Sequence, residues 1–384
     1  MKISTIFFKI ISLTLFIVGP YFINFLKVIF FKIKFYSTYR KWINFEIALI
    51  LTILGTLFPP KGDILDYYND FEELKNLDFS YFLLFLKTKS DYLLYILEYI
   101  FGKLNLSFKA LQFSILLFAN IIWMKLLTEI QTKERNNQYF FLCIFLMFNL
   151  PIYFMYRSMM ASLLLSFGIY LFLNKKKYIY FLISSILWHK SMVLILFIFI
   201  IGYCFRKYSQ VKMFLSTLIL GVLMYKVGLV LMQEFFPRFY QYYVLGYWGT
   251  EFLKEMSINE KIALFFPVLR YLAILFLYII YLTRIKLKDK MFNLGIAIVL
   301  ISLMYFFSII GFIRLLYSFT LMVLVINISE IKEVDFKYNL LVKLIVITIF
   351  ILCYIVQILD FKQFLLNINY LSIFNESILN IFIN

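Results

Sequence analysis

The chain has 384 residues, of which 64% are hydrophobic, and its 38 basic and 21 acidic residues give a formal net charge of +17. The apolar residues gather in runs of about 20, the length of a helix that crosses a bilayer, so a soluble globular protein is excluded. The basic residues lie in the connectors between these runs, as in cytoplasmic loops of membrane proteins, which excludes nucleic-acid binding. The composition predicts an all-α integral membrane protein with residues 1–384 in one polytopic transmembrane domain.

About ten apolar stretches are long enough to cross the membrane as helices. They are residues 5–26, 42–58, 106–128, 138–156, 158–174, 211–232, 261–283, 291–311, 313–329 and 339–358.

The charge of the connectors predicts their orientation, because cytoplasmic loops are rich in lysine and arginine. The basic connector after the first span is therefore expected inside. Residues 59–91 carry more acids than lysines and are expected to form the first outer loop; the acids are Asp63, Asp66, Asp70, Glu72, Glu73, Asp78 and Asp91. Residues 233–260 are expected to form the second outer loop, and residues 359–384 an amphipathic tail.

Residues 178–204 do not fit a single crossing. One helix of this length would place His189 and Lys190 near its middle, and a lysine at the bilayer centre costs roughly 2.5–3.5 kcal/mol. It would also invert the orientation of every later loop. We therefore favour a hairpin of two half-length helices, 178–188 and 191–204, whose tip lines a cavity because non-helical backbone at membrane depth needs protein or water around it.

Two arginines are candidate anion ligands, and a third lies inside a predicted span. Arg157 and Arg314 each stand at the start of a predicted span, where backbone N–H groups and the helix dipole also favour negative charge. Arg270 lies about nine residues inside its span, which favours a role or a buried partner. Two guanidinium groups at helix starts suit a phosphate-bearing substrate. The alternative is that Arg157 and Arg314 extend along the interface towards lipid headgroups.

Candidate acid–base residues lie on the same predicted outer side. Asp63, Tyr67 and Phe71 are spaced by four, so they share one face of a helix. A carboxylate beside aromatic rings suits sugar binding, although a solvated loop is the alternative. His189 is the only histidine, which excludes a multi-histidine metal site. It is either a base at the hairpin tip or a hydrogen-bonded structural group.

Four local patterns, in order along residues 62–317, resemble the Wzy-type polysaccharide polymerases and, within them, the EpsG-like group. They are Gly62-x-Asp63 with Tyr67 and Phe71; Arg157 with Ala161; His189-Lys190-Ser191; and Arg314 with Tyr317. The chain departs from this family in one place. Such proteins usually carry arginine just before the Gly-x-Asp, where this chain has Pro59-Pro60-Lys61.

The resemblance implies a GT-C-like glycosyltransferase of the bacterial inner membrane that works on its outer face. The substrate would be an oligosaccharide linked to undecaprenyl pyrophosphate, and a flippase and a chain-length regulator are expected partners. Arg157 and Arg314, with Arg270, would bind the pyrophosphate in place of a metal, and no cofactor is expected. Asp63 or His189 would be the base, and Asp66 and Tyr67 would contact sugar.

Two other functions stay open. A lipid-linked-oligosaccharide flippase would need no base and would normally show internal repeat symmetry, which is not evident in this sequence. A membrane O-acyltransferase would use the histidine but would leave the two arginines at helix starts unexplained.

Overall fold

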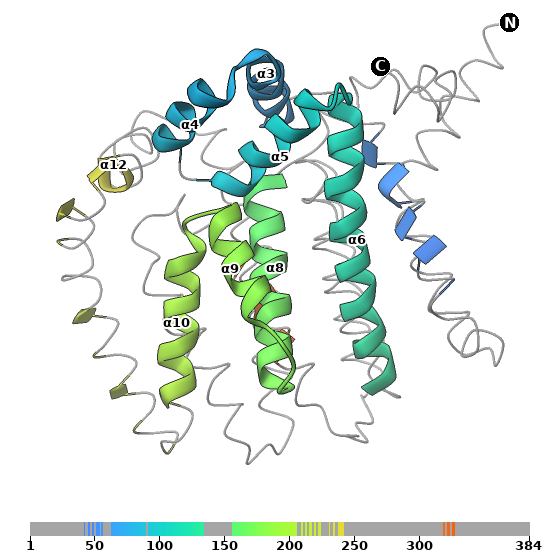
Figure 1. The fold of residues 1–384 in the computed structure, drawn as a ribbon. Helices are drawn as coiled ribbons and strands as arrows, with labels where there is room; N and C mark the ends of the chain where they lie inside the picture. The colour runs from blue at the N-terminus through green and yellow to red at the C-terminus, as the bar shows by residue number, and fades with distance from the viewer. Residues whose placement is uncertain are drawn as a thin grey trace, which may run out of the picture. The chain divides into compact units, whose positions relative to one another are not determined.

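The computed structural model describes residues 63–133 apart from Ser90, residues 156–205, and scattered positions within 42–56, 209–241 and 318–326. Within these residues every regular element is an α-helix, and no β-strand occurs among them (Figure 1). The chain divides into two compact units. The first contains residues 1–163, 183–190 and 361–384, and the second contains residues 164–182 and 191–360.

The predicted first outer loop contains two helices, α3 (Asp63–Asn76) and α4 (Phe79–Thr88). Helix α3 has acids in its first turn and a lysine in its last, as the helix dipole favours. Its apolar face is buried through Ile64, Tyr67, Phe71 and Leu74. The predicted shared face is therefore present for Tyr67 and Phe71, whereas Asp63 is exposed at the first residue of the helix.

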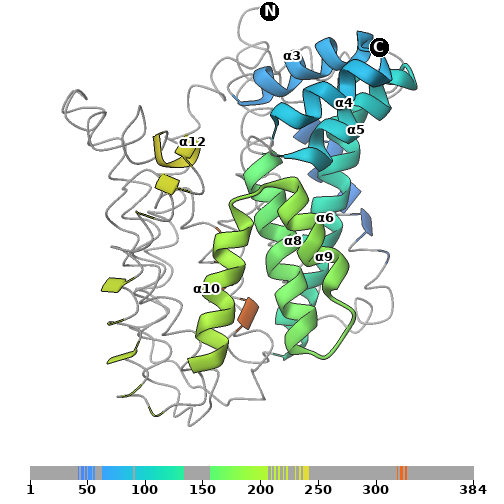
Figure 2. The same cartoon turned by 60° about the vertical axis from the view of Figure 1, so that its left-hand side comes forward.

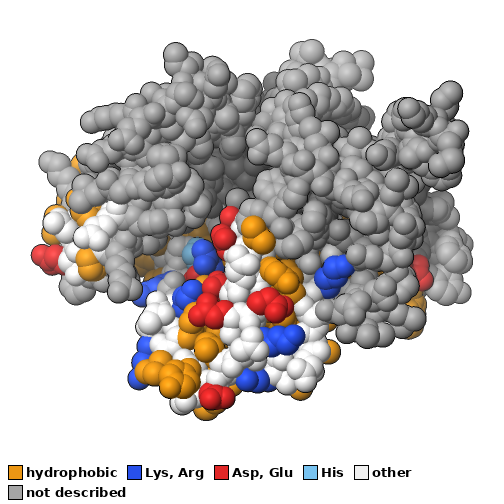
Figure 3. Space-filling model, turned by 90° about the horizontal axis from the view of Figure 1, so that it is seen from above, with side chains coloured by type: hydrophobic (Ala, Val, Ile, Leu, Met, Phe, Trp, Pro, Cys, Tyr) orange, Lys and Arg blue, Asp and Glu red, His pale blue; other side chains and the backbone are white. Residues whose placement is uncertain are grey.

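Helix α5 (Tyr92–Lys103) packs along α3. The contact is close at Gly102, where an added Cβ would lie 2.9 Å from the Cα of Lys75. Tyr95 of α5 joins Leu74 and Phe82 in a buried cluster, and Tyr99 stacks on Phe82 with ring centroids 4.0 Å apart. Figure 2 shows α3, α4 and α5 next to one another. The face seen in Figure 3 carries acidic and basic side chains next to each other.

Two of the described helices are long and apolar enough to cross a membrane. Helix α6 (Phe108–Lys133) contains the stretch Phe108–Leu126, and helix α8 is Tyr156–Leu173. These stretches coincide with the predicted spans 106–128 and 158–174. Helix α6 also contacts the segment 42–56 through polar groups: the amide of Gln112 donates to the carbonyl of Gly55, and that of Asn120 donates to the hydroxyl of Thr52.

Two short helices, α9 (Ile179–Trp188) and α10 (Met192–Phe205), occupy the segment for which a hairpin is predicted. The helix breaks at residues 189–191, and Figures 1 and 2 show the turn that joins the two. The ring of Phe172 contacts Tyr178 at the start of α9 and Tyr203 near the end of α10. The chain therefore folds back on itself at residues 189–191, as predicted for the hairpin.

The remaining described helix is α12 (Pro237–Tyr240), which lies in the predicted second outer loop. The other predicted spans and the tail 359–384 lie wholly or partly outside the described residues, so the total number of crossings and the GT-C-like arrangement stay predictions.

Candidate functional site

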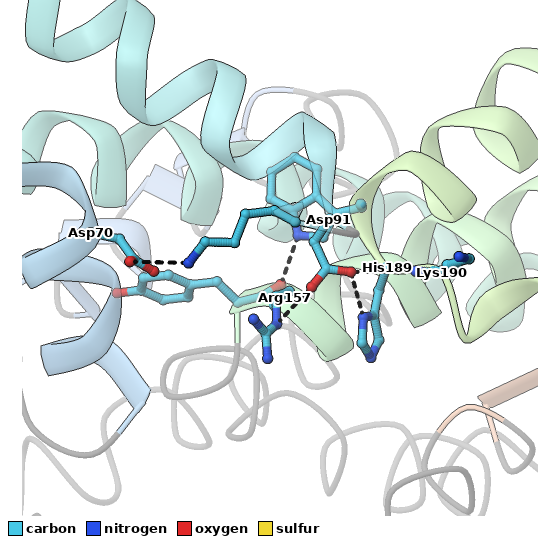
Figure 4. Close-up of polar contacts among 8 residues, drawn as sticks. Asp70, Asp91, Arg157, His189 and Lys190 are labelled. Carbon is cyan, nitrogen blue, oxygen red and sulfur yellow. Dashed lines mark hydrogen bonds and ion pairs between the residues drawn. The ribbon is translucent and has the colours of Figure 1, made fainter. Parts of the chain in front are cut away.

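A buried carboxylate, Asp91, lies at the centre of the site. It is the residue before α5, and its side chain makes no capping hydrogen bond to that helix. Its Oδ1 lies 2.9 Å from Nδ1 of His189, and its Oδ2 lies 3.3 Å from Nε of Arg157 (Figure 4). The backbone N–H of Lys190 also donates to Oδ1, at 3.4 Å. We call Asp91, Arg157 and His189 the Asp91 cluster.

Local packing brings the two partners of Asp91 together. Arg157 is in the first turn of α8, and His189 follows the last residue of α9. The indole N–H of Trp188 donates to the backbone carbonyl of Tyr156, at 3.1 Å. Since Trp188 and Tyr156 are both buried, this bond fixes the end of α9 against the start of α8, and hence His189 beside Arg157.

Helix α3 places an aromatic ring, that of Tyr67, beside the cluster. The ring of Tyr67 stacks on that of Tyr156 with centroids 5.7 Å apart. The guanidinium carbon of Arg157 lies 6.0 Å from the centroid of the Tyr67 ring, at the outer limit of a cation–π contact. The Asp91 cluster therefore joins the start of α5, the start of α8 and the α9–α10 turn, with α3 alongside.

The charges in the cluster stabilise one another. Burial by itself would raise the pKa of Asp91, because a carboxylate loses hydration. The hydrogen bond to His189 and the charges of His189 and Arg157 outweigh burial, and the pKa of Asp91 falls below its ordinary value. The side chain of Asp91 is 5% exposed, that of His189 is 21% exposed and that of Arg157 is 35% exposed. Solvent or a ligand can therefore reach the two partners but not the carboxylate between them.

A second set of charges lies on the α3 side of α5. Lys89 pairs with Asp70 at 3.5 Å and also lies over the rings of Phe85 and Tyr95. Burial raises the pKa of Tyr95 to about 12, and the charge of Asp70 contributes in the same direction. Tyr95 also hydrogen-bonds to Arg157, so it connects these charges to the Asp91 cluster.

The structure brings together some of the residues that the sequence singles out. Arg157, His189 and Tyr67 lie within or beside the Asp91 cluster. Asp63 and Asp66 are exposed in the first turn of α3, and the charge of Asp63 acts on Tyr67. Arg270 and Arg314 lie outside the described residues. Among the residues that the structure describes, no three histidine, cysteine or acidic side chains form a group that could hold a metal ion.

A family model, that of the EpsG family, matches residues 40–372. The chain belongs to the EpsG family. It is thus a membrane protein of the polysaccharide polymerase type, with glycosyltransferase-like activity, and the resemblance drawn from the four sequence patterns is confirmed. Comparisons with curated proteins and with solved structures give no match. The EpsG-family match includes every residue of the Asp91 cluster and both arginines outside the described residues.

Sequence reasoning missed Asp91, which it counted only as one of the acids of the outer loop. A usable signal exists in hindsight: an acid stands directly before the apolar run 92–102. The same run contains a second acid, Glu98, which the sequence reasoning also passed over. An acid inside or at the end of an apolar helix needs a partner or a changed pKa, so each was a candidate for closer study.

Proposed function

We infer that this EpsG-family chain is a polymerase that joins oligosaccharide units carried on undecaprenyl pyrophosphate, on the outer face of the inner membrane. The observation that carries the proposal is the Asp91 cluster. In this cluster one carboxylate contacts both an arginine, which can bind a phosphate, and a histidine, which can accept a proton. Family membership supplies the class of reaction, and the cluster supplies the groups that this reaction needs.

The reaction needs two kinds of assistance. A hydroxyl oxygen of the acceptor unit forms a bond to the anomeric carbon of the donor glycan, and the bond from that carbon to the pyrophosphate oxygen breaks. Negative charge grows on the leaving undecaprenyl pyrophosphate, so a fixed cation lowers the barrier. The acceptor hydroxyl loses its proton, so a base is needed.

Arg157 is the proposed ligand of the pyrophosphate, with Arg314 and Arg270 as further proposed ligands. A guanidinium binds phosphate oxygens through two parallel N–H groups, which a lysine cannot do. Arg157 is partly exposed while its Nε is held by Asp91. Its orientation is therefore set before substrate binds, which is the condition for effective electrostatic stabilisation.

His189 is our preferred base over Asp63. It shares Asp91 with Arg157, so a proton acceptor and the proposed leaving-group ligand lie side by side. Asp63 is exposed at the first residue of α3 and stays the second candidate. Asp66 and Tyr67 stay proposed sugar contacts: Asp66 is exposed in the first turn of α3, and the buried Tyr67 ring lies beside Arg157.

The test uses the purified full-length chain in liposomes with a lipid-linked oligosaccharide, and measures polymer length and initial rate. Replacing Arg157 with Ala should lower the rate roughly 10²–10³-fold, as loss of a preorganised charge does. Arg157→Lys should recover little of the lost rate. The matched control is Lys89→Ala, which removes a similarly exposed cation, 31% against 35%. Full-length polymer from Arg157→Ala would contradict the role, and transport of the lipid without polymer would favour a flippase.

The proposed orientation follows from the hairpin. Lys175, Lys176 and Lys177, before α9, should face the cytoplasm, and so should residue 207 after α10. The α9–α10 turn and the Asp91 cluster would then face outward. Single cysteines at 176 and 207 in a cysteine-free background test this with a membrane-impermeant thiol reagent. Labelling of 207 from outside, with 176 protected, would contradict the hairpin topology.

A further inference from the structure

Asp91 accepts from a different donor on each of its oxygens. Oδ1 faces Nδ1 of His189 and the backbone N–H of Lys190, and Oδ2 faces Nε of Arg157. Arginine can only donate, so the side of the carboxyl group that faces Arg157 must be an acceptor. The lowered pKa of Asp91 indicates that the group is an ionised carboxylate, which can only accept. Nδ1 of His189 must therefore carry a proton.

We propose that Asp91 is a positioning residue that fixes His189 in the tautomer with its proton on Nδ1 and leaves Nε2 as the proton acceptor of the site. The same carboxylate holds Arg157 by Nε and so aims the rest of the guanidinium. The catalytic part of this proposal rests on the proposed polymerase function; the tautomer does not.

The consequence for catalysis is a matter of charge. When Nε2 takes the proton of the acceptor hydroxyl, the imidazole ring becomes positively charged. The Asp91 carboxylate, 2.9 Å from Nδ1, stabilises that charge where solvent does not compete, because the carboxylate is buried. Among the described residues, Asp91 and Tyr95 do not use all of the N–H groups of Arg157, so donors remain for a phosphate.

The substitution Asp91→Asn gives a specific expectation for the tautomer of His189. The carbonyl oxygen of the asparagine can serve only one of the two sides, and its NH₂ group must face the other. Each orientation sets the NH₂ group against a donor, the guanidinium of Arg157 on one side or the backbone N–H of Lys190, 3.4 Å away, on the other. The oxygen faces Arg157, because leaving a charged donor without an acceptor costs more than leaving a neutral one. The NH₂ group then faces Nδ1 of His189, which must become an acceptor. Asp91→Asn should therefore move the proton to Nε2 and remove the lone pair that the base needs.

His189 is the only histidine in the chain, so one labelled residue reports on the site. The full-length protein is prepared with ¹⁵N only in histidine and with a histidine-free affinity tag, and placed in lipid. The ¹⁵N spectrum is followed as the pH is raised until the ring is neutral. Wild type should show the protonated nitrogen as Nδ1, and Asp91→Asn should show it as Nε2. Asp91→Glu keeps a carboxylate and should keep the wild-type tautomer.

The matched control is Asp70→Asn, which removes another paired carboxylate of the same unit, the partner of Lys89. It should leave the tautomer of His189 unchanged. A wild-type ring with its proton on Nε2 overturns the proposal without any variant, which matters if Asp91→Asn does not fold.

Polymer synthesis is measured on the same preparations. Asp91→Asn should lower the rate roughly 10²–10⁴-fold, as loss of a general base does, and Asp91→Glu should recover part of it. A reversed tautomer with full polymer synthesis overturns the catalytic part. An unchanged tautomer with lost synthesis overturns the tautomer as the reason for the loss. A wild-type protein that makes no polymer yet shows the expected tautomer contradicts the proposed function and supports the positioning by Asp91.

Discussion

The two buried carboxyl groups of α5, Asp91 at its start and Glu98 about two turns further on, are in opposite states. Both are nearly inaccessible, with 3% of Asp91 and none of Glu98 exposed. Asp91 has three donors around it, whereas neither oxygen of Glu98 has a hydrogen-bond partner among the described residues. Burial, with the charge of Asp70 adding to it, raises the pKa of Glu98 to about 9, while the pKa of Asp91 is lowered.

The difference shows that burial alone does not decide the charge of a carboxyl group. At Asp91 the fold brings an arginine and a histidine from other helices, and the carboxylate keeps its charge. At Glu98 no donor comes from the residues that the structure describes, and the raised pKa keeps the group neutral at physiological pH. A charged, partnered group can hold other side chains in place, while a neutral, unpartnered group in the same helix is a cost to stability.

The largest expected effect is on activity. Asp91→Asn and Glu98→Gln make the same chemical change at the two positions. The first should lower polymer synthesis roughly 10²–10⁴-fold because it disturbs the base. The second should leave the rate within a few-fold of wild type, because Glu98 is already neutral. Initial rates at equal amounts of folded protein test this. Equal losses in the two variants would show that Asp91 and Glu98 do not differ in their importance for activity.

The fold near Asp91 and Glu98 was predictable from the sequence only where a local sequence pattern indicates the structure. The spacing of Tyr67 and Phe71 identified the buried face of α3. The pair His189-Lys190 in an apolar run identified the break between α9 and α10, because one helix would hold a lysine deep in the membrane. Arg157 was recognisable because it begins an apolar helix.

The centre of the site was not predictable, because its contacts are distant in the sequence. Asp91 and His189 are 98 positions apart, and their contact depends on how α5, α8 and α9 pack. The exposure of Asp63 depends on packing too, since the helical spacing alone put it on the same face as Tyr67 and Phe71. Sequence periodicity also does not indicate that Glu98 finds no donor in the described part of the fold, because its neighbours in the sequence are apolar.

The next effect in size is the pH dependence of stability that comes from Glu98. Between its ordinary pKa of 4.5 and about 9, the folded state keeps a proton that the unfolded state has lost. The unfolding free energy should therefore fall as pH rises through this window. The slope is about 1.4 kcal/mol per pH unit, or roughly 3 kcal/mol from about pH 6 to about pH 8.

Glu98→Gln should remove this slope and stabilise the protein more at the higher pH. Thermal unfolding of the purified protein at the two pH values measures the difference. The control is Glu73→Gln, at an exposed position of α3, which should leave the slope of wild type in place. A Glu98→Gln variant with the wild-type slope would show that Glu98 does not carry it.

A smaller effect is expected from Gly102→Ala. The added Cβ would meet backbone of α3 at 2.9 Å, so α3 and α5 must separate, at a cost of about 1–3 kcal/mol. Asp70, which raises the pKa of Glu98, lies on α3, whereas the partners of Asp91 lie outside α3. The variant should therefore lower the upper pH limit of the window in which Glu98 affects stability, without changing the slope inside it, and should leave polymer synthesis within a few-fold of wild type. Thermal unfolding and initial rates together test this, and a loss of synthesis without a loss of stability would contradict it.

The smallest effect is the contribution of Asp91 to stability in acid. Its pKa is lower in the folded state than its ordinary value of 3.8, so its stabilisation is complete above that value and is lost as pH falls through the folded pKa. Wild type should therefore lose stability more steeply than Asp91→Asn as the pH falls below about 3.8, because the variant has no carboxylate to protonate.

Asp78→Asn is the matched control for this last effect. Asp78 precedes α4 as Asp91 precedes α5, and neither side chain caps its helix. Asp78 is exposed, whereas Asp91 is buried between Arg157 and His189. If the partners of Asp91 cause the acid dependence, Asp78→Asn should follow the wild-type curve. Identical flattening in both variants would mean that an aspartate before a helix is sufficient, and the Asp91 cluster would then have no separate part in acid stability.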